Sequence, residues 1–315
     1  MQLSIEELKS IYYGGYRFEE TDDGYLHAHH YSPEQIEYFR SISEIWYYRS
    51  LSNAGKTLDF ITEATELSFE YKLLWIGTID TIEIMIDGVI KRVFHEDEIS
   101  DMGKISYTMA SGKKRVVIYL PADAQILIRN FEINAPVENV VKGEKVLWMG
   151  DSITQGYGPY RSSHTYVNVA NRILNYNVVN QGLGGYRYDK GSLMDLDGFY
   201  PDKIITAFGT NQYMTDGREC VEEYYRKLSE LYPDVPVISI TPLYRIETPE
   251  KLAKLVEFSD IIKEVCSSYD NITVIDGFSL MGHTQDYLHD AVHPNALGCE
   301  MYGRNLADII IKENL

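Results

Sequence analysis

The chain of 315 residues lacks the features that mark disulfide-rich, membrane-spanning or secreted proteins. Its three cysteines, Cys220, Cys266 and Cys299, are odd in number and widely spaced, which predicts buried free thiols instead of disulfides or a metal site. No apolar run approaches the length of a membrane span. The segment Met1–Glu7 lacks the basic start and apolar stretch of a signal peptide, so we expect a cytoplasmic protein.

The chain also lacks a basic patch. Lys and Arg number 29 against 47 Asp and Glu, a formal net charge of −18 that is spread over both halves of the sequence. Phosphate backbones and anionic lipids bind to clustered positive charge, so we expect neither nucleic acid nor membrane as a partner. The acidity is better explained as a solvated, repulsive surface that aids solubility.

The first part of the sequence alternates apolar and polar residues with period two. Turn signals such as Asp87-Gly88 and Ser111-Gly112 separate the alternating segments. The clearest of these segments are 67–73, 82–86, 115–120 and 126–133. Such segments predict antiparallel hairpins, and with no strong helix among them they indicate a jelly-roll-like β-sandwich domain over residues 1–140.

After residue 144 the pattern changes to strand followed by helix. Strand-length apolar runs lie near 145–149, 177–180, 203–208, 235–240 and 272–276. Helix-periodic segments lie near 162–175, 218–231, 249–268 and 296–312. The alternation predicts βαβ units, that is, an α/β domain over residues 141–315 with a mainly parallel sheet between two helical layers.

Gly150-Asp151-Ser152-Ile153 directly follows the apolar run Val146–Met149. A strand that ends in glycine and then presents a serine exposes a hydroxyl at the sheet edge, but a serine needs a base to become a nucleophile. Asp290-Ala291-Val292-His293-Pro294 supplies an imidazole and an acid at suitable spacing. The structural alternative is that Ser152 and Asp290 each cap a following helix.

Two further motifs follow predicted strands. Asn180-Gln181-Gly182-Leu183-Gly184-Gly185 and Gly209-Thr210-Asn211 place glycines and an amide where ligands gather in open α/β sheets. A glycine N–H, an asparagine amide and the N–H of the nucleophile could together stabilise an oxyanion.

These four motifs resemble the four blocks of the SGNH (GDSL-like) hydrolases, which carry Ser, Gly, Asn and His in this order. The resemblance covers about residues 144–315 and implies a flavodoxin-like three-layer α/β/α fold. It implies Ser152 as nucleophile, His293 as base and Asp290 as its partner. Gly185 and Asn211 would be the oxyanion donors, with Gly184 as the alternative to Gly185. Neither a metal nor an organic cofactor is expected.

A sandwich that precedes an SGNH domain is similar to the arrangement in carbohydrate acetylesterases. The resemblance therefore implies a serine esterase that removes short acyl groups, acetyl above all, from a small-molecule or oligosaccharide ester. Tyr186 and Tyr213 follow the motifs and are candidates for stacking on a sugar ring. We also expect the first domain to pack on the catalytic edge. The alternatives are a lysophospholipase or thioesterase of the same family, and an inactive sugar-binding protein.

Two other motifs resemble ligand-binding sequences but are better explained without a ligand. His27-Ala28-His29-His30 has no accompanying metal-ligand pattern, so we expect a surface turn there. Asn53-Ala54-Gly55-Lys56-Thr57 ends like a phosphate-binding loop, but Ser50 stands where the first glycine belongs and no βαβ unit surrounds it.

Overall fold

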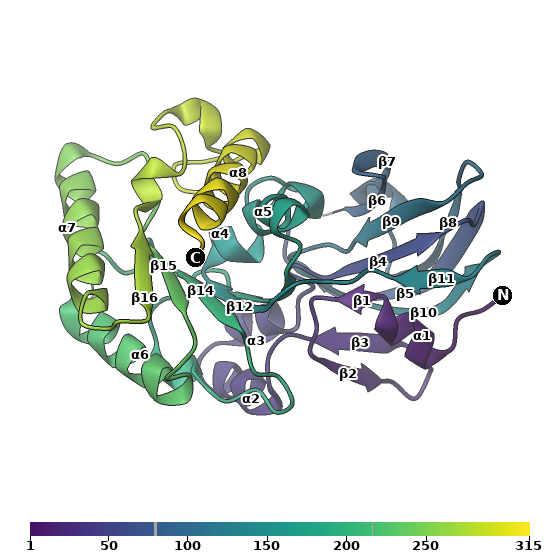
Figure 1. Cartoon of the computed structure of the whole chain (residues 1–315), viewed down its shortest axis with the longest axis horizontal. Coiled ribbons are helices and arrows are strands. Elements are labelled where there is room, and N and C mark those ends of the chain that lie inside the picture. Colours follow the sequence, from purple (N-terminus) through teal and green to yellow (C-terminus); the bar gives the residue numbers. More distant parts are fainter. Residues whose placement is uncertain (79–80, 216) are drawn as a thin grey trace.

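A computed structural model describes residues 1–78, 81–215 and 217–315. The two halves lie side by side along the long axis, the sandwich around the N-terminus and the helix-covered sheet opposite (Figure 1). None of the helices in the described ranges is long and apolar enough to cross a membrane.

The first half is an antiparallel sandwich, as predicted. One sheet has the order β1 (Tyr12–Tyr13), β4 (Thr57–Thr62), β9 (Lys114–Tyr119), β6 (Ile82–Ile86) and β7 (Val89–Phe94), with β11 (Val137–Asn139) paired to β4. The other has the order β2 (Arg17–Glu20), β3 (Leu26–His29), β10 (Ala124–Ile133), β5 (Glu66–Ile76) and β8 (Met102–Thr108). Their inward side chains, among them Phe60, Ile118, Phe69 and Ile128, form one core.

The second half is a five-stranded parallel sheet, which confirms the predicted fold. Its order is β13 (Asn177–Gly182), β12 (Lys145–Gly150), β14 (Lys203–Ala207), β15 (Val237–Ile240) and β16 (Ile272–Ile275). The covering helices are α5 (Tyr166–Leu174) and α8 (Ala296–Glu313) on one face, and α6 (Arg218–Leu231) and α7 (Pro249–Cys266) on the other. This is the doubly wound flavodoxin-like order, in which the first strand lies inside the sheet.

The central strand β12 shows why the sequence folds in this way. Val146 and Trp148 point into the core beneath α5 and α8, whereas Leu147 and Met149 point into the core beneath α6 and α7. A strand covered on both faces must be apolar where it is buried, and β12 is apolar from Val146 to Met149, after the exposed Lys145.

Helices in the first half contradict the expectation that it contains no strong helix. The structure has α1 (Ile5–Ser10), α2 (Pro33–Ile42) and α3 (Glu44–Ser50). At α2 the side chain of Ser32 accepts from the N–H of Gln35, the side chain of Gln35 accepts from the N–H of Ser32, and Pro33 opens the helix. This capping box was present in the sequence, although strand patterning dominates around it.

The α2–α3 hairpin packs on the other half of the molecule. Tyr31 and Phe39 belong to the core beneath the parallel sheet, together with Leu147 and Tyr186. Residues 31–50 therefore pack in the core beneath the parallel sheet, although they precede most of the sandwich strands in the sequence. The division at residues 140 and 141 stays a prediction, with β11 ending at Asn139 and β12 beginning at Lys145.

The histidine cluster is not a surface turn. His27 and His29 lie in β3, and these two side chains and His30 are almost fully buried. Desolvation lowers the pKa of His27 to about 3, so its ring is held neutral at ordinary pH. Within the described ranges no group of His, Cys, Asp or Glu is arranged to hold a metal ion. The cysteines are free thiols, with Cys266 and Cys299 buried and Cys220 partly exposed.

Candidate active site

The four motifs meet at one edge of the parallel sheet. Ser152 follows β12 as the first residue of α4 (Ser152–Gln155), the glycine-rich loop follows β13, and Asn211 lies in the turn after β14. Asp290 and His293 lie in the loop before α8. Because all strands of the sheet run parallel, their carboxyl ends share this edge, which is where doubly wound folds bind ligands.

Ser152, His293 and Asp290 form a hydrogen-bonded chain. Ser152 Oγ lies 2.8 Å from His293 Nε2, and His293 Nδ1 lies 2.8 Å from Asp290 Oδ2. A carboxylate only accepts hydrogen bonds, so Nδ1 carries the proton and Nε2 is free to accept the hydroxyl hydrogen of the serine. The two residues predicted to meet are encoded 141 positions apart.

Neither Ser152 nor Asp290 is a helix cap. The N-cap of α4 is Asp151, whose side chain accepts from the N–H of Ile153, and the N-cap of α8 is Asn295. Asp290 Oδ1 instead accepts from the backbone N–H groups of Val292 and His293, at 2.7 and 2.8 Å. The carboxylate is thereby fixed against the imidazole.

Burial and hydrogen bonding set the charges of these groups. Burial lowers the pKa of the His293 ring below its ordinary value, and the neighbouring Asp290 only partly opposes this. Burial raises the pKa of Asp290, but the hydrogen bonds from His293 and Val292 outweigh it and leave the pKa below the ordinary value. The pair at neutral pH is therefore a neutral imidazole beside a carboxylate. Desolvation raises the pKa of the fully buried Asp151 to about 7.

The glycine-rich loop is held close to α4. A Cβ on Gly182 would lie 2.2 Å from the backbone nitrogen of Gln155, so only glycine allows this approach. The side chain of Asn180 donates to Thr154 O at 2.9 Å and accepts from the N–H of Gly182 at 2.8 Å. Gly185 has a φ of 75°, which favours glycine.

Hydrogen bonding and exposure distinguish Gly184 from Gly185, the two candidates for the oxyanion glycine. The N–H of Gly184 donates to Gln155 Oε1 at 2.6 Å, so it already has a partner. Gly185 is exposed, and so is Asn211, whose amide donates to Tyr186 O at 2.9 Å. This arrangement favours Gly185 over Gly184 as a donor to a ligand.

The comparisons with known proteins agree with this geometry. Residues 148–301 match the model of the GDSL-like lipase/acylhydrolase family. This part of the chain is a GDSL-like lipase/acylhydrolase domain. No curated protein gives a significant match to the chain.

Solved structures share the fold of both halves of this chain. A putative GDSL-like lipase from Bacteroides ovatus has a TM-score of 0.77 and 18% identity, covering 99% of this chain and 97% of that one. The salicylyl-acyltransferase SsfX3 from a tetracycline biosynthetic pathway has a TM-score of 0.75 and 18% identity, covering 96% and 94%. A family two carbohydrate esterase from Clostridium thermocellum, in complex with cellohexaose, has a TM-score of 0.70 and 17% identity, covering 96% and 98%.

The two tyrosines expected to contact a sugar differ in exposure. The Tyr186 side chain is buried, with its ring edge-to-face against Phe39 and Trp46 and its hydroxyl donating to Asp189. The ring therefore packs the core, and the expected sugar contact is wrong for Tyr186 because none of its faces is open. Tyr213 is partly exposed and donates to Glu247 at 3.1 Å, so its sugar contact stays a prediction.

Sequence reasoning missed the side chains that the first half places at the glycine-rich loop. Trp46 Nε1 donates to Gly184 O at 3.2 Å. The Arg49 guanidinium lies so close to Gly184 that a Cβ there would be 2.5 Å from Arg49 Nη1. Asp123 accepts from Gln155 Nε2 at 2.5 Å and lies 3.9 Å from Arg49 Nε. The predicted packing of the first half on the catalytic edge is confirmed by these contacts.

Two further neighbours lie in the GDSL-like domain itself. The Tyr157 ring lies edge-on to the His293 ring at 4.5 Å between centroids. Arg245 Nη1 donates to Thr210 O at 3.0 Å, while Nη2 pairs with Glu247 at 2.9 Å. Arg245 therefore supports the turn that carries Asn211. No sequence motif includes this arginine.

Proposed function

We propose that this protein is a serine esterase that removes short acyl groups, acetyl above all, from a carbohydrate through an acyl-enzyme on Ser152. The hydrogen-bonded chain from Ser152 through His293 to Asp290, at the ligand-binding edge of a GDSL-like domain, carries the proposal. An inactive sugar-binding protein has no need of this alignment.

In the first step Ser152 Oγ attacks the ester carbonyl carbon while its proton moves to His293 Nε2. The C=O π electrons move to oxygen and give a tetrahedral intermediate with one negative charge. Asp290 accepts from Nδ1–H and stabilises the imidazolium. When the intermediate collapses, the bond to the sugar oxygen breaks and the imidazolium returns the proton to the leaving alcohol.

Three donors would stabilise the oxyanion. The N–H of Ser152 is at the first turn of α4, where N–H groups have no intrahelical partner. The N–H of Gly185 and the amide of Asn211 lie on the two neighbouring loops. Such fixed donors act where charge develops and need no reorganisation during the reaction.

In the second step water hydrolyses the acyl-enzyme. The water oxygen attacks the acyl carbonyl carbon while His293 takes one proton from the water, and a second tetrahedral intermediate forms. When this intermediate collapses, the bond to Ser152 Oγ breaks and His293 returns the proton to Ser152. The products are the carboxylic acid and the free enzyme, so protons and electrons balance without an added cofactor.

The carbohydrate part of the proposal is supported by likeness and by the surroundings of the site. Two structural neighbours that cover both halves are named as family two carbohydrate esterases. Trp46 and Arg49 extend the rim of the site from the first half, and both are partly exposed. An aromatic ring beside a planar cation suits a hydroxyl-rich ring better than a long acyl chain.

The first test is Ser152→Ala, assayed on an aryl acetate with Ser268→Ala as a matched surface control. We expect turnover to fall by at least about 1,000-fold in the first variant and to remain unchanged in the second. A fluorophosphonate should label the parent and not Ser152→Ala. Near-native turnover of Ser152→Ala would overturn the mechanism, and a parent that fails to react would favour the inactive protein.

A chain-length series of aryl esters separates deacetylation from lipid or thioester hydrolysis. We expect kcat/KM to be highest for acetate and to fall with each added methylene pair. A rise towards octanoate would favour a lysophospholipase or thioesterase. Acetylated mono- and oligosaccharides, with released acetate as the readout, then identify the acceptor alcohol.

A further inference from the structure

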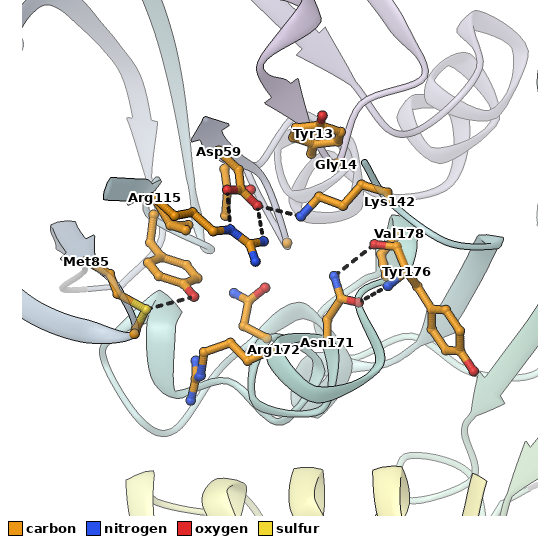
Figure 2. Close-up of a pocket in the computed structure, with 16 residues that line it drawn as sticks. Tyr13, Gly14, Asp59, Met85, Arg115, Lys142, Asn171, Arg172, Tyr176 and Val178 are labelled. Atoms are coloured by element: carbon orange, nitrogen blue, oxygen red, sulfur yellow. Dashed lines mark hydrogen bonds and ion pairs between the residues drawn. The ribbon is translucent and has the colours of Figure 1, made fainter. Parts of the chain in front are cut away.

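A cavity lies between the two halves, away from the catalytic edge (Figure 2). It has a volume of about 160 Å³. One wall comes from β1, β4 and β9 of the sandwich, and the opposite wall from α5 and β13. Its lining in the described ranges includes none of the proposed catalytic residues.

One side of this cavity holds two cations on a single carboxylate. Arg115 binds Asp59 with two hydrogen bonds, at 2.8 and 2.7 Å, and Lys142 Nζ lies 2.5 Å from Asp59 Oδ2. The Asp59 side chain is 2% exposed and that of Lys142 is 10% exposed. Figure 2 shows both cations converging on Asp59 from different segments of the chain. Lys142 and Asp59 form a buried pair, and the 42% exposed Arg115 adds one positive charge that no second carboxylate in the cluster balances.

The opposite side adds a cation and two amides. Arg172 lines the cavity from α5, where it donates to Ser163 O and lies 3.6 Å from the half-exposed Glu300. Asn168 and Asn171 come from the same helix. Among the described lining residues Asp59 is the sole carboxylate, against three cations. This is a local positive excess in a chain whose net charge is −18.

The Arg115 and Arg172 side chains are 42% and 28% exposed, so the excess positive charge is partly exposed and an anion can bind to it and compensate it. Burial lowers the pKa of Lys142, Asp59 opposes this, and the nearby Arg115 adds to the lowering. Arginine presents a planar fork of donors that matches carboxylate and phosphate oxygens.

We infer that this cavity between the two halves is a binding site for a small oxyanion, a carboxylate or a phosphate group, held by Lys142, Arg115 and Arg172. The volume is close to that of a cavity that holds one benzene ring, so the ligand has about ten non-hydrogen atoms or fewer. The site contacts both halves and a bound anion therefore stabilises their junction. The inference does not rest on the proposed esterase activity.

The test uses the full chain and inorganic phosphate. Calorimetric titration with sodium phosphate, with sodium chloride adjusted to constant ionic strength, should give saturable binding and a matching rise in Tm. Sodium acetate in a parallel titration distinguishes a carboxylate site from a phosphate site. Absence of saturable binding of both anions would overturn the proposal.

Matched charge removals locate the binding. Lys142→Gln removes one of the three positive charges that line the cavity, whereas Lys113→Gln removes one positive charge from an exposed Lys113–Glu138 pair elsewhere on the sandwich. We expect Lys142→Gln to weaken anion binding at least 10-fold and Lys113→Gln to change it less than twofold. Equal weakening by both would show general charge screening and would refute the site.

A third variant tests the site even if Lys142→Gln fails to fold. Arg172→Gln leaves the pair of Lys142 and Asp59 intact, and it should also weaken the anion at least 10-fold if the site is as described. Turnover of an aryl acetate by each folded variant is measured beside binding. Loss of binding with retained turnover is the expected result, and unchanged binding in folded Arg172→Gln and Lys142→Gln would overturn the inference.

Discussion

The two halves of the molecule contribute to the site in different ways. The parallel sheet brings all four motifs to one edge, because its strands point the same way and each ends in a loop there. The first half contributes no motif, yet its side chains Trp46, Arg49 and Asp123 reach the glycine-rich loop and α4. The residues of the proposed reaction therefore lie in one half, while side chains of both halves contact the glycine-rich loop.

The contacts between the halves also differ from each other. Near Ser152 the contact is made of packed rings and of hydrogen bonds, with one pair of opposite charges, Arg49 and Asp123. At the cavity the contact is ionic and holds more positive than negative charge. This contrast predicts that anions act on the junction at the cavity and leave the catalytic edge unaffected.

The largest expected effect after loss of Ser152 concerns the oxyanion donors of the parallel half. Asn211→Ala should lower kcat roughly 100-fold, about 3 kcal/mol, since one donor to the developing charge is lost. Asn305→Ala on α8 is the control, because the Asn305 amide donates a hydrogen bond to Leu280 O outside the site. An effect below threefold on kcat would remove Asn211 from the proposed oxyanion site.

Phe39→Ala tests whether the hairpin of the first half supports the second. Phe39 is 1% exposed in the core beneath the parallel sheet, so its truncation should destabilise the protein by about 3 kcal/mol. Ile42→Ala, at an exposed position on the same helix, should cost less than about 0.5 kcal/mol. Denaturant unfolding measures both. Equal, small effects would show that the hairpin is dispensable for the second core.

Trp46→Ala tests the shared rim. We expect KM for acetylated oligosaccharides to rise about 10-fold, since an aromatic contact contributes roughly 1 kcal/mol or more, while kcat on an aryl acetate changes little. Ile45→Ala is the exposed neighbour that serves as control. If kcat falls for both substrates alike, Trp46 acts on the glycine-rich loop and not on substrate.

The smallest effect concerns pH. His293 must be neutral to accept the serine proton, and its pKa is lowered below the ordinary value of 6.5. The acidic limb of kcat/KM should therefore have its midpoint below pH 6.5, with activity gained as pH rises through it. Asp290→Asn removes the opposing charge and should move the limb to lower pH as well as reduce turnover. A parent midpoint above 6.5 would contradict the described burial.

Local patterns in the sequence were sufficient for most of the fold and for the catalytic chain. Strand alternation, βαβ periodicity and the four motifs each depend on residues within a few positions of one another. They predicted the sandwich, the parallel sheet and the meeting of Ser152 with His293. The hairpin of α2 and α3 was missed although Ser32 and Gln35 form a capping box, because strand patterns surround it.

The sequence by itself determined which residues are the candidates for nucleophile, base and acid, since these proposed roles follow from side-chain chemistry and motif order. Tertiary structure alone decided that Tyr186 is buried, that Trp46 reaches Gly184 across 138 positions, and that Lys142 and Arg115 share Asp59. The physical reason is that burial and unbalanced charge belong to surfaces brought together by packing, and no short stretch of sequence encodes which surfaces meet.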